Sequence, residues 1–119
     1  MTQRTYAALT KNESVLATTA DAAATLIYTC PLNHDAEIVF LTLTNGGATI
    51  TTNVELYSAA DLAWKHLTRS HTIAGGTTYN VLDGSLIYLR PGDKISVYKS
   101  GGTLDATVSV KQYYNPTRS

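Results

Sequence analysis

Several features are scarce in this 119-residue chain, and each scarcity excludes a class of protein. Cys30 is the only cysteine, so no disulfide can form within the chain. Charged residues make up 15% of the sequence and nine basic residues balance nine acidic ones, so no net field attracts nucleic acid or a membrane surface. Apolar runs reach only about four or five residues, far short of the roughly 20 needed to span a bilayer. The chain starts without a signal peptide pattern, which predicts a soluble protein made in a reducing compartment.

Patterns typical of catalytic and metal sites are also missing. The sequence has no Gly-x-Ser-x-Gly elbow and no phosphate-binding glycine loop. His34, His66 and His71 lack the paired spacing of zinc ligands, and Cys30 has no second cysteine nearby. His34 precedes Asp35 in an expected loop, where a general base would have no identifiable nucleophile. The sequence therefore predicts a protein that is not an enzyme and that uses no metal or cofactor.

What the chain has in abundance is strand-forming residues. It contains 19 threonines and eight tyrosines, and both types favour strands. Residues 50–57 and 104–111 alternate apolar and polar side chains, which is the period of a strand with one buried face. Residues 37–43 are apolar at both parities, which predicts a central strand covered on both sides. We expect a buried core that includes Leu41, Leu43, Val54, Leu56, Ile95, Val97, Val108 and Val110.

Turn signals separate these strands. Asn45-Gly46-Gly47 predicts a tight hairpin into the next strand, because Asn-Gly supplies the positive φ that such turns need. Further turns are expected at 75–76, 83–84, 91–92 and 101–102, so that a short apolar strand lies between the turns at 83–84 and 91–93. Residues 17–26 read as a loop leading into a strand at about 26–30. The pattern predicts an all-β fold, a single antiparallel β-sandwich (jelly-roll or Ig-like) of about seven to nine strands.

Interaction residues are expected mainly in two terminal segments. We predict one domain over residues 1–119, with an N-terminal arm of about 1–13 and a C-terminal tail of about 113–119 beyond the last strand. The segment 65–71 is the one local basic excess, and in a regular strand its basic side chains would share a face. Tyrosine and arginine are enriched in protein interfaces. The candidate interface residues are Arg4, Tyr6, Lys11, Lys65, Arg69, His71, Tyr113, Tyr114 and Arg118.

A carbohydrate-binding module is the main alternative from another functional class. Aromatic side chains bind sugars when several rings lie on one face beside carboxylates or amides. The second half of the chain is rich in tyrosine, including Tyr79, Tyr88 and Tyr98. Sequence alone does not show whether such rings share a face.

Several short phrases together resemble a family of small virion structural proteins encoded by tailed bacteriophages. The resemblance covers roughly residues 25–112, and each phrase mainly marks a strand or a turn. The phrases are Tyr28-Thr29-Cys30-Pro31, the strand from Ile38 to Asn45, Val54 to Tyr57, Leu82-Asp83-Gly84, Pro91-Gly92-Asp93, and Leu104 to Val110. Leu32-Asn33-His34 departs from the family, which more often has an Ala-Gly turn at that point.

The resemblance implies a non-enzymatic building block present in many copies on a virus particle, made in the host cytoplasm. The first expectation is a capsid decoration or cement protein that binds major capsid subunits and forms a homo-oligomer in the particle, without nucleic acid or membrane. One alternative is a neck, tail or baseplate component. Another is a receptor- or glycan-binding module on the same particle.

Overall fold

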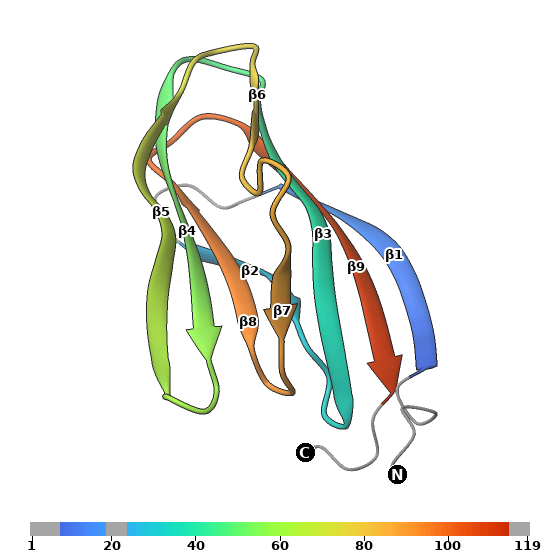
Figure 1. Ribbon diagram of the computed structural model, residues 1–119. Coiled ribbons are helices and arrows are strands. Elements are labelled where there is room, and N and C mark those ends of the chain that lie inside the picture. The colour runs from blue at the N-terminus through green and yellow to red at the C-terminus, as the bar shows by residue number, and fades with distance from the viewer. Residues whose placement is uncertain (1–7, 19–23, 115–119) are drawn as a thin grey trace, which may run out of the picture.

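The computed structural model describes residues 8–18 and 24–114, and these form an antiparallel β-sandwich without a helix in the described part. One sheet contains the strands β1 (Ala8–Thr18), β9 (Leu104–Tyr114), β3 (His34–Asn45), β6 (Thr78–Asn80) and β7 (Ile87–Leu89). The other sheet contains β2 (Ala24–Thr29), β8 (Lys94–Lys99), β4 (Ile50–Ser58) and β5 (Ala63–Ile73). In Figure 1, β5, β4 and β8 of the second sheet lie on the left, and β3, β9 and β1 of the first sheet lie on the right. The predicted all-β sandwich is confirmed.

The order of the strands is that of a jelly roll. The first sheet runs β1-β9-β3-β6, with β7 pairing the same edge of β3 as β6, and the second sheet runs β2-β8-β4-β5. Counting β6 and β7 as one interrupted strand gives eight strands in two four-stranded sheets. Most connections therefore cross from one sheet to the other, and β4–β5 is the only consecutive pair joined as a hairpin within the described residues.

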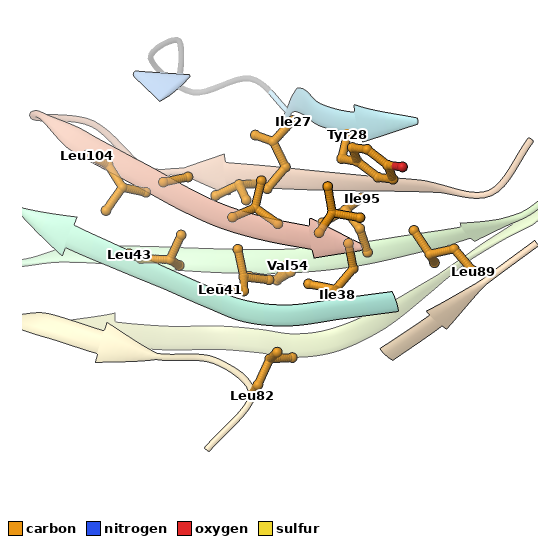
Figure 2. Packing of buried hydrophobic residues seen from close by; sticks show 14 of the residues in the cluster. Ile27, Tyr28, Ile38, Leu41, Leu43, Val54, Leu82, Leu89, Ile95 and Leu104 are labelled. Carbon is orange, nitrogen blue, oxygen red and sulfur yellow. The ribbon is translucent and has the colours of Figure 1, made fainter. Parts of the chain in front are cut away.

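The core fills the space between the sheets, as Figure 2 shows, and the expected alternation of β4 and β9 is confirmed. Seven of the eight residues predicted to be buried are at most 2% exposed, and Leu56 is half-buried against them. The fully buried larger side chains include Ile38, Leu41, Leu43, Leu89, Ile95 and Leu104.

A β-bulge explains why residues 37–43 are apolar at both parities. The register between β3 and β9 shifts between Ile38 and Phe40, so Val39 is an extra residue in β3. Ile38 and Leu41 consequently both face the core, although they differ in parity, and each is 0% exposed. Phe40 is 41% exposed. The prediction of a strand covered on both sides is wrong, because the bulge resets the alternation instead.

The predicted hairpin at residues 45–47 is also wrong, because β3 and β4 belong to different sheets. Asn45 is 0% exposed, and its Nδ2 donates hydrogen bonds to the carbonyl oxygens of Ala48 (2.7 Å) and Ile73 (3.0 Å). Its Oδ1 accepts one from the N–H of Gly47 at 2.9 Å. A Cβ added at Gly75 would lie 2.2 Å from the carbonyl oxygen of Gly47. These residues form a packed corner, which we call the Asn45 corner, where the β3–β4 and β5–β6 connections meet.

The N-terminal part of the chain differs from the expected arm and loop. Residues 8–13, expected in an arm, lie in β1, which pairs with β9 from Ala8–Tyr114 to Thr18–Asp105. Residues 17–18 end this strand, and β2 starts at Ala24 instead of about residue 26. Long-range pairing with β9 thus orders a segment whose own sequence pattern is weak.

Candidate interaction surfaces

The described residues bring no metal-binding cluster together. Among them, no group of three or more His, Cys, Asp and Glu side chains could hold a metal ion. Cys30 is 1% exposed, and its Sγ lies 3.3 Å from the carbonyl oxygen of His34. Burial, followed by the charges of Asp35 and Asp93, raises the pKa of the Cys30 thiol to about 12. The thiol is therefore protonated at neutral pH and a poor nucleophile.

His34 is positioned by contacts at the end of the sandwich. Its Nδ1 lies 2.9 Å from the carbonyl oxygen of Leu32, and its ring meets the edge of Tyr114 at a centroid distance of 5.5 Å. The role that these contacts support is structural: they hold the β2–β3 turn against the end of β9.

The structure separates the nine candidate interface residues. Arg4, Tyr6 and Arg118 lie outside the described residues. Lys11 lies in β1, where its backbone pairs with Gln112 of β9. Tyr113 and Tyr114 belong to β9 and pair with Asp35 and His34 of β3, so the expectation that they lie beyond the last strand is wrong.

The basic residues of β5 do not follow one face by simple alternation. Lys65 and His71 pair with Leu56 and Thr52, which belong to the inner set of β4, whereas Arg69 lies within the first of two register shifts. By register, Lys65 and His71 therefore lie on the same side of β5, whereas the bulges interrupt the period of two at Arg69. Lys65 forms a salt bridge with Asp61 at 3.1 Å. The ring of His71 stacks on Tyr79 at a centroid distance of 3.8 Å.

One exposed aromatic surface covers the outer face of the first sheet. We call it the Tyr88 patch, and it consists of Phe40, Tyr88, Tyr113, Glu37 and Lys111. The register places Glu37 of β3 between Tyr88 of β7 and Lys111 of β9. Tyr88 is 70% exposed, and a hydrogen bond to Glu37, together with the charge of Glu37, raises the pKa of the Tyr88 hydroxyl. The patch thus combines exposed rings with charges of both signs.

A second aromatic surface lies on the outer face of the other sheet. We call it the Trp64 platform, and it consists of Tyr57, Trp64, Lys94, Glu55 and His66. Tyr57 of β4 lies opposite Trp64 of β5, with ring centroids 5.1 Å apart and planes at 51°. The Lys94 ammonium lies 5.0 Å from the centroid of the Tyr57 ring. Nε2 of His66 lies 3.3 Å from a carboxylate oxygen of Glu55.

Sequence reasoning missed both of these surfaces. The alternation in residues 50–57 places Tyr57 on the polar face together with Glu55, and this is the one sequence signal that the Tyr57 ring lies on the outer face. Trp64 becomes its neighbour only through the register of the β4–β5 hairpin. The apolar run 37–43 predicts a buried Phe40, because the sequence gives no sign of the bulge at Val39.

Comparisons with known proteins show a shared fold. No family model matches the chain, and no curated protein sequence does. A solved structure of Bacillus endospore appendages, described as disulfide-linked pili, is 16% identical with a TM-score of 0.50, covering 97% of this chain and 96% of that one. The infectious bursal virus-derived T=1 particle is 10% identical with a TM-score of 0.52, covering 92% of this chain and 33% of that one.

A second structure of infectious bursal disease virus, the Gx strain, gives a similar result. It is 11% identical with a TM-score of 0.51, and the match covers 90% of this chain and 33% of the viral chain. This chain thus spans about a third of the length of these viral chains. Identities this low show a common fold: the chain shares its sandwich with proteins of a pilus and of virus particles.

Proposed function

We propose that this chain is a non-enzymatic structural subunit of a tailed-bacteriophage particle, bound in many copies to the outside of the capsid as a decoration protein. The observation that carries the proposal is the jelly-roll sandwich, which has the fold of proteins that build virus particles. The sequence phrases in residues 25–112 that resemble small phage virion proteins support the same proposal. The buried, protonated thiol of Cys30 and the structural contacts of His34 support a role without catalysis.

The contact with major capsid subunits is proposed to form at the Tyr88 patch and the neighbouring terminal segments. Tyrosine is enriched at the centres of protein interfaces, and charged residues such as glutamate and lysine are more typical of their polar rims. Ala8 pairs with Tyr114, and Tyr113 belongs to the patch, so residues 1–7 and 115–119 connect to the sheet at the end that carries it. Arg4, Tyr6 and Arg118 therefore remain candidate contact residues together with the patch.

Binding in many copies suits the charge of this chain. With nine basic and nine acidic residues, it brings no strong global repulsion between neighbouring copies. Contacts between adjacent copies in a homo-oligomer would let individually weak capsid contacts act together through multivalency. Neck, tail or baseplate attachment would use the same physics and is the first alternative position on the particle.

A fibre subunit is the second candidate, because the match to the pilus protein covers 97% of this chain and 96% of that one. That pilus is described as disulfide-linked. Here Cys30 is the only cysteine and is 1% exposed, and one cysteine per copy can link subunits only in pairs. A fibre of this chain would therefore need noncovalent contacts.

Occupancy on particles that lack this protein tests the proposal. Full-length protein, Tyr88→Ala, a truncation of residues 115–119 and the control Trp64→Ala would be added to such particles, and bound copies counted from gels and electron micrographs. We expect Tyr88→Ala to weaken binding by about tenfold or more, as a central interface tyrosine does. The truncation should also weaken binding, whereas the control, on the opposite sheet, should bind as the full-length protein does.

Each contrary result has a defined meaning. Equal occupancy for all four proteins would show that the contact with the capsid lies elsewhere, in other loops or in the 65–71 segment of β5. Labelled protein found only on necks or tails would replace the capsid by that location. Absence from particles, with fibres formed by the purified protein alone, would overturn the decoration role in favour of the second candidate.

A further inference from the structure

The Trp64 platform carries an exposed ring on the outer face of the second sheet. Tyr57 and Trp64 pair across the β4–β5 hairpin, and Trp64 is 46% exposed. Lys94 lies over the Tyr57 ring, so the indole of Trp64 is the larger aromatic surface left to solvent. An exposed indole beside a second ring offers apolar area to a flat ligand without requiring a deep cavity.

Polar groups at the edge of the platform supply both hydrogen-bond donors and acceptors. Glu55 lies opposite His66, with 3.3 Å between carboxylate oxygen and Nε2, and both side chains keep part of their surface exposed. The Lys94 ammonium adds up to three donors on the other side of Tyr57. A ligand with one apolar face and a rim of hydroxyl groups would match this arrangement.

Backbone pairing and a turn contact hold the strands that carry the platform. Tyr57 pairs on one side with Trp64 and on the other with Lys94. The turn that follows β4 is fastened because Oδ1 of Asp93 accepts a hydrogen bond from the N–H of Ala59 at 2.9 Å. Figure 1 shows the β4–β5 and β7–β8 connections at the same end of the sandwich. Binding here would cost little ordering entropy.

We propose that the Trp64 platform binds a pyranose unit of an oligosaccharide. The axial C–H groups of a pyranose form a flat, weakly positive face that packs on the negative face of an indole. Its equatorial hydroxyls would then reach Glu55, His66 and Lys94 at the rim. The proposal does not depend on the capsid contact, because the platform and the Tyr88 patch lie on opposite sheets.

The surroundings favour a sugar over a nucleic acid strand. Aromatic platforms that stack bases lie in grooves with an excess of positive charge that follows the phosphates. Around this platform, Glu55 and Asp61 offset the basic residues, and the whole chain has no net charge. A neutral or mildly acidic oligosaccharide makes no demand for such an excess.

The chain contains one tryptophan, so its intrinsic fluorescence reports directly on this site. The purified full-length protein would be titrated with maltohexaose, chitohexaose and hexagalacturonate, which differ in stereochemistry and charge. We expect saturable quenching or a blue shift with at least one of them, with a dissociation constant of about 0.1–10 mM, the range of a shallow site. Single-stranded DNA of matched length would be titrated as a separate arm.

Variants link the signal to the platform. Binding of the active sugar, measured by calorimetry or bead retention, should fall at least tenfold in Trp64→Ala and in Glu55→Gln/His66→Ala, but much less in Trp64→Phe, which keeps a ring. Tyr88→Ala is the matched control, since it removes an exposed ring from the opposite sheet. Unchanged circular dichroism and melting of each variant would exclude misfolding as the cause.

Three results would overturn the inference. The first is no saturable response to any of the three sugars at about 10 mM. The second is an equal loss of binding in Tyr88→Ala and Trp64→Ala. The third is tighter binding of the DNA than of every sugar, which would assign the platform to single strands.

Discussion

Replacing Asn45 with aspartate keeps the shape of the side chain but removes the N–H groups that hold the Asn45 corner. In the native protein, Nδ2 donates to the carbonyl oxygens of Ala48 and Ile73, while Oδ1 accepts from the N–H of Gly47. In Asn45→Asp the bond from Gly47 can persist. The two carbonyl oxygens instead face a carboxylate oxygen at a site that is 0% exposed.

The expected cost follows from these contacts. Losing the buried hydrogen bond to Ile73 leaves its carbonyl oxygen unsatisfied and costs about 1–3 kcal/mol, and losing the part-buried bond to Ala48 adds about 1 kcal/mol. The fold should therefore be destabilised by about 2–4 kcal/mol near neutral pH. When protonated, the introduced carboxyl can restore one donor, and the loss should then be about half as large. Burial and the two carbonyl dipoles raise the pKa of this carboxyl in the folded state.

The sign of the pH dependence is therefore fixed. Because the folded state holds the proton more tightly than the unfolded state, stability falls as pH rises from about 4, the ordinary pKa of aspartate, until the folded carboxyl ionises. Urea unfolding at several values between pH 3 and pH 7 would measure the difference between variant and native protein. Asn53→Asp is the control, since Asn53 only accepts, from the N–H of Ser70 at 2.6 Å. If Asn45→Asp were as mild as this control at every pH, the side-chain amide would not hold the corner.

Three further predictions address the core, the corner and the thiol. Leu41→Ala, at a side chain that is 0% exposed, should cost about 2–5 kcal/mol in urea unfolding, and an unchanged midpoint would place Leu41 outside the core. Gly75→Ala should destabilise strongly, because its Cβ would meet the Gly47 oxygen at 2.2 Å, whereas Gly46→Ala, with nothing within 4 Å, should be nearly neutral in the same thermal melts. Folding raises the pKa of the Cys30 thiol from 9.0 to about 12, so between these values the thiol ionises only in the unfolded chain. The native protein should therefore lose stability above about pH 9. A Cys30→Ala variant with the same decline in stability between pH 8 and 10 would contradict this prediction.

Much of the fold could be predicted because the local pattern and the tertiary structure agree. In residues 104–110 every second side chain is apolar, and the structure buries Leu104, Ala106, Val108 and Val110 to within 1% exposure. The jelly-roll connections could not be predicted in this way. An Asn-Gly-Gly sequence specifies a change of direction, but whether the next strand joins the same sheet depends on partners far along the chain. Here β3 pairs with β9 and β4 pairs with β8, so the turn became a corner.

The surfaces were harder to predict than the core, because exposed side chains leave no periodic signal of their neighbours. The position of Tyr113 and Tyr114 near the end of the chain predicts a tail, yet both residues pair with β3. The alternation expected in β5 is interrupted by two bulges between His66 and His71, and no turn residue in the sequence marks them. Trp64 and Tyr57 become neighbours only once the hairpin register is known. Each of these is a property of pairing between strands, not of one strand.

A sandwich separates its two outer faces by a shared core, and this allows two functions to be tested independently. Stacked sheets lie about 10 Å apart, so an exposed side chain on one outer face has no contact with the other. Tyr88 is 70% exposed and Trp64 is 46% exposed, so truncating either ring leaves the core between them intact. Tyr88→Ala should consequently weaken only particle binding, and Trp64→Ala should weaken only sugar binding. Loss of both activities in a single ring variant would mean that the two surfaces are not separate sites, and that one of them acts through the fold.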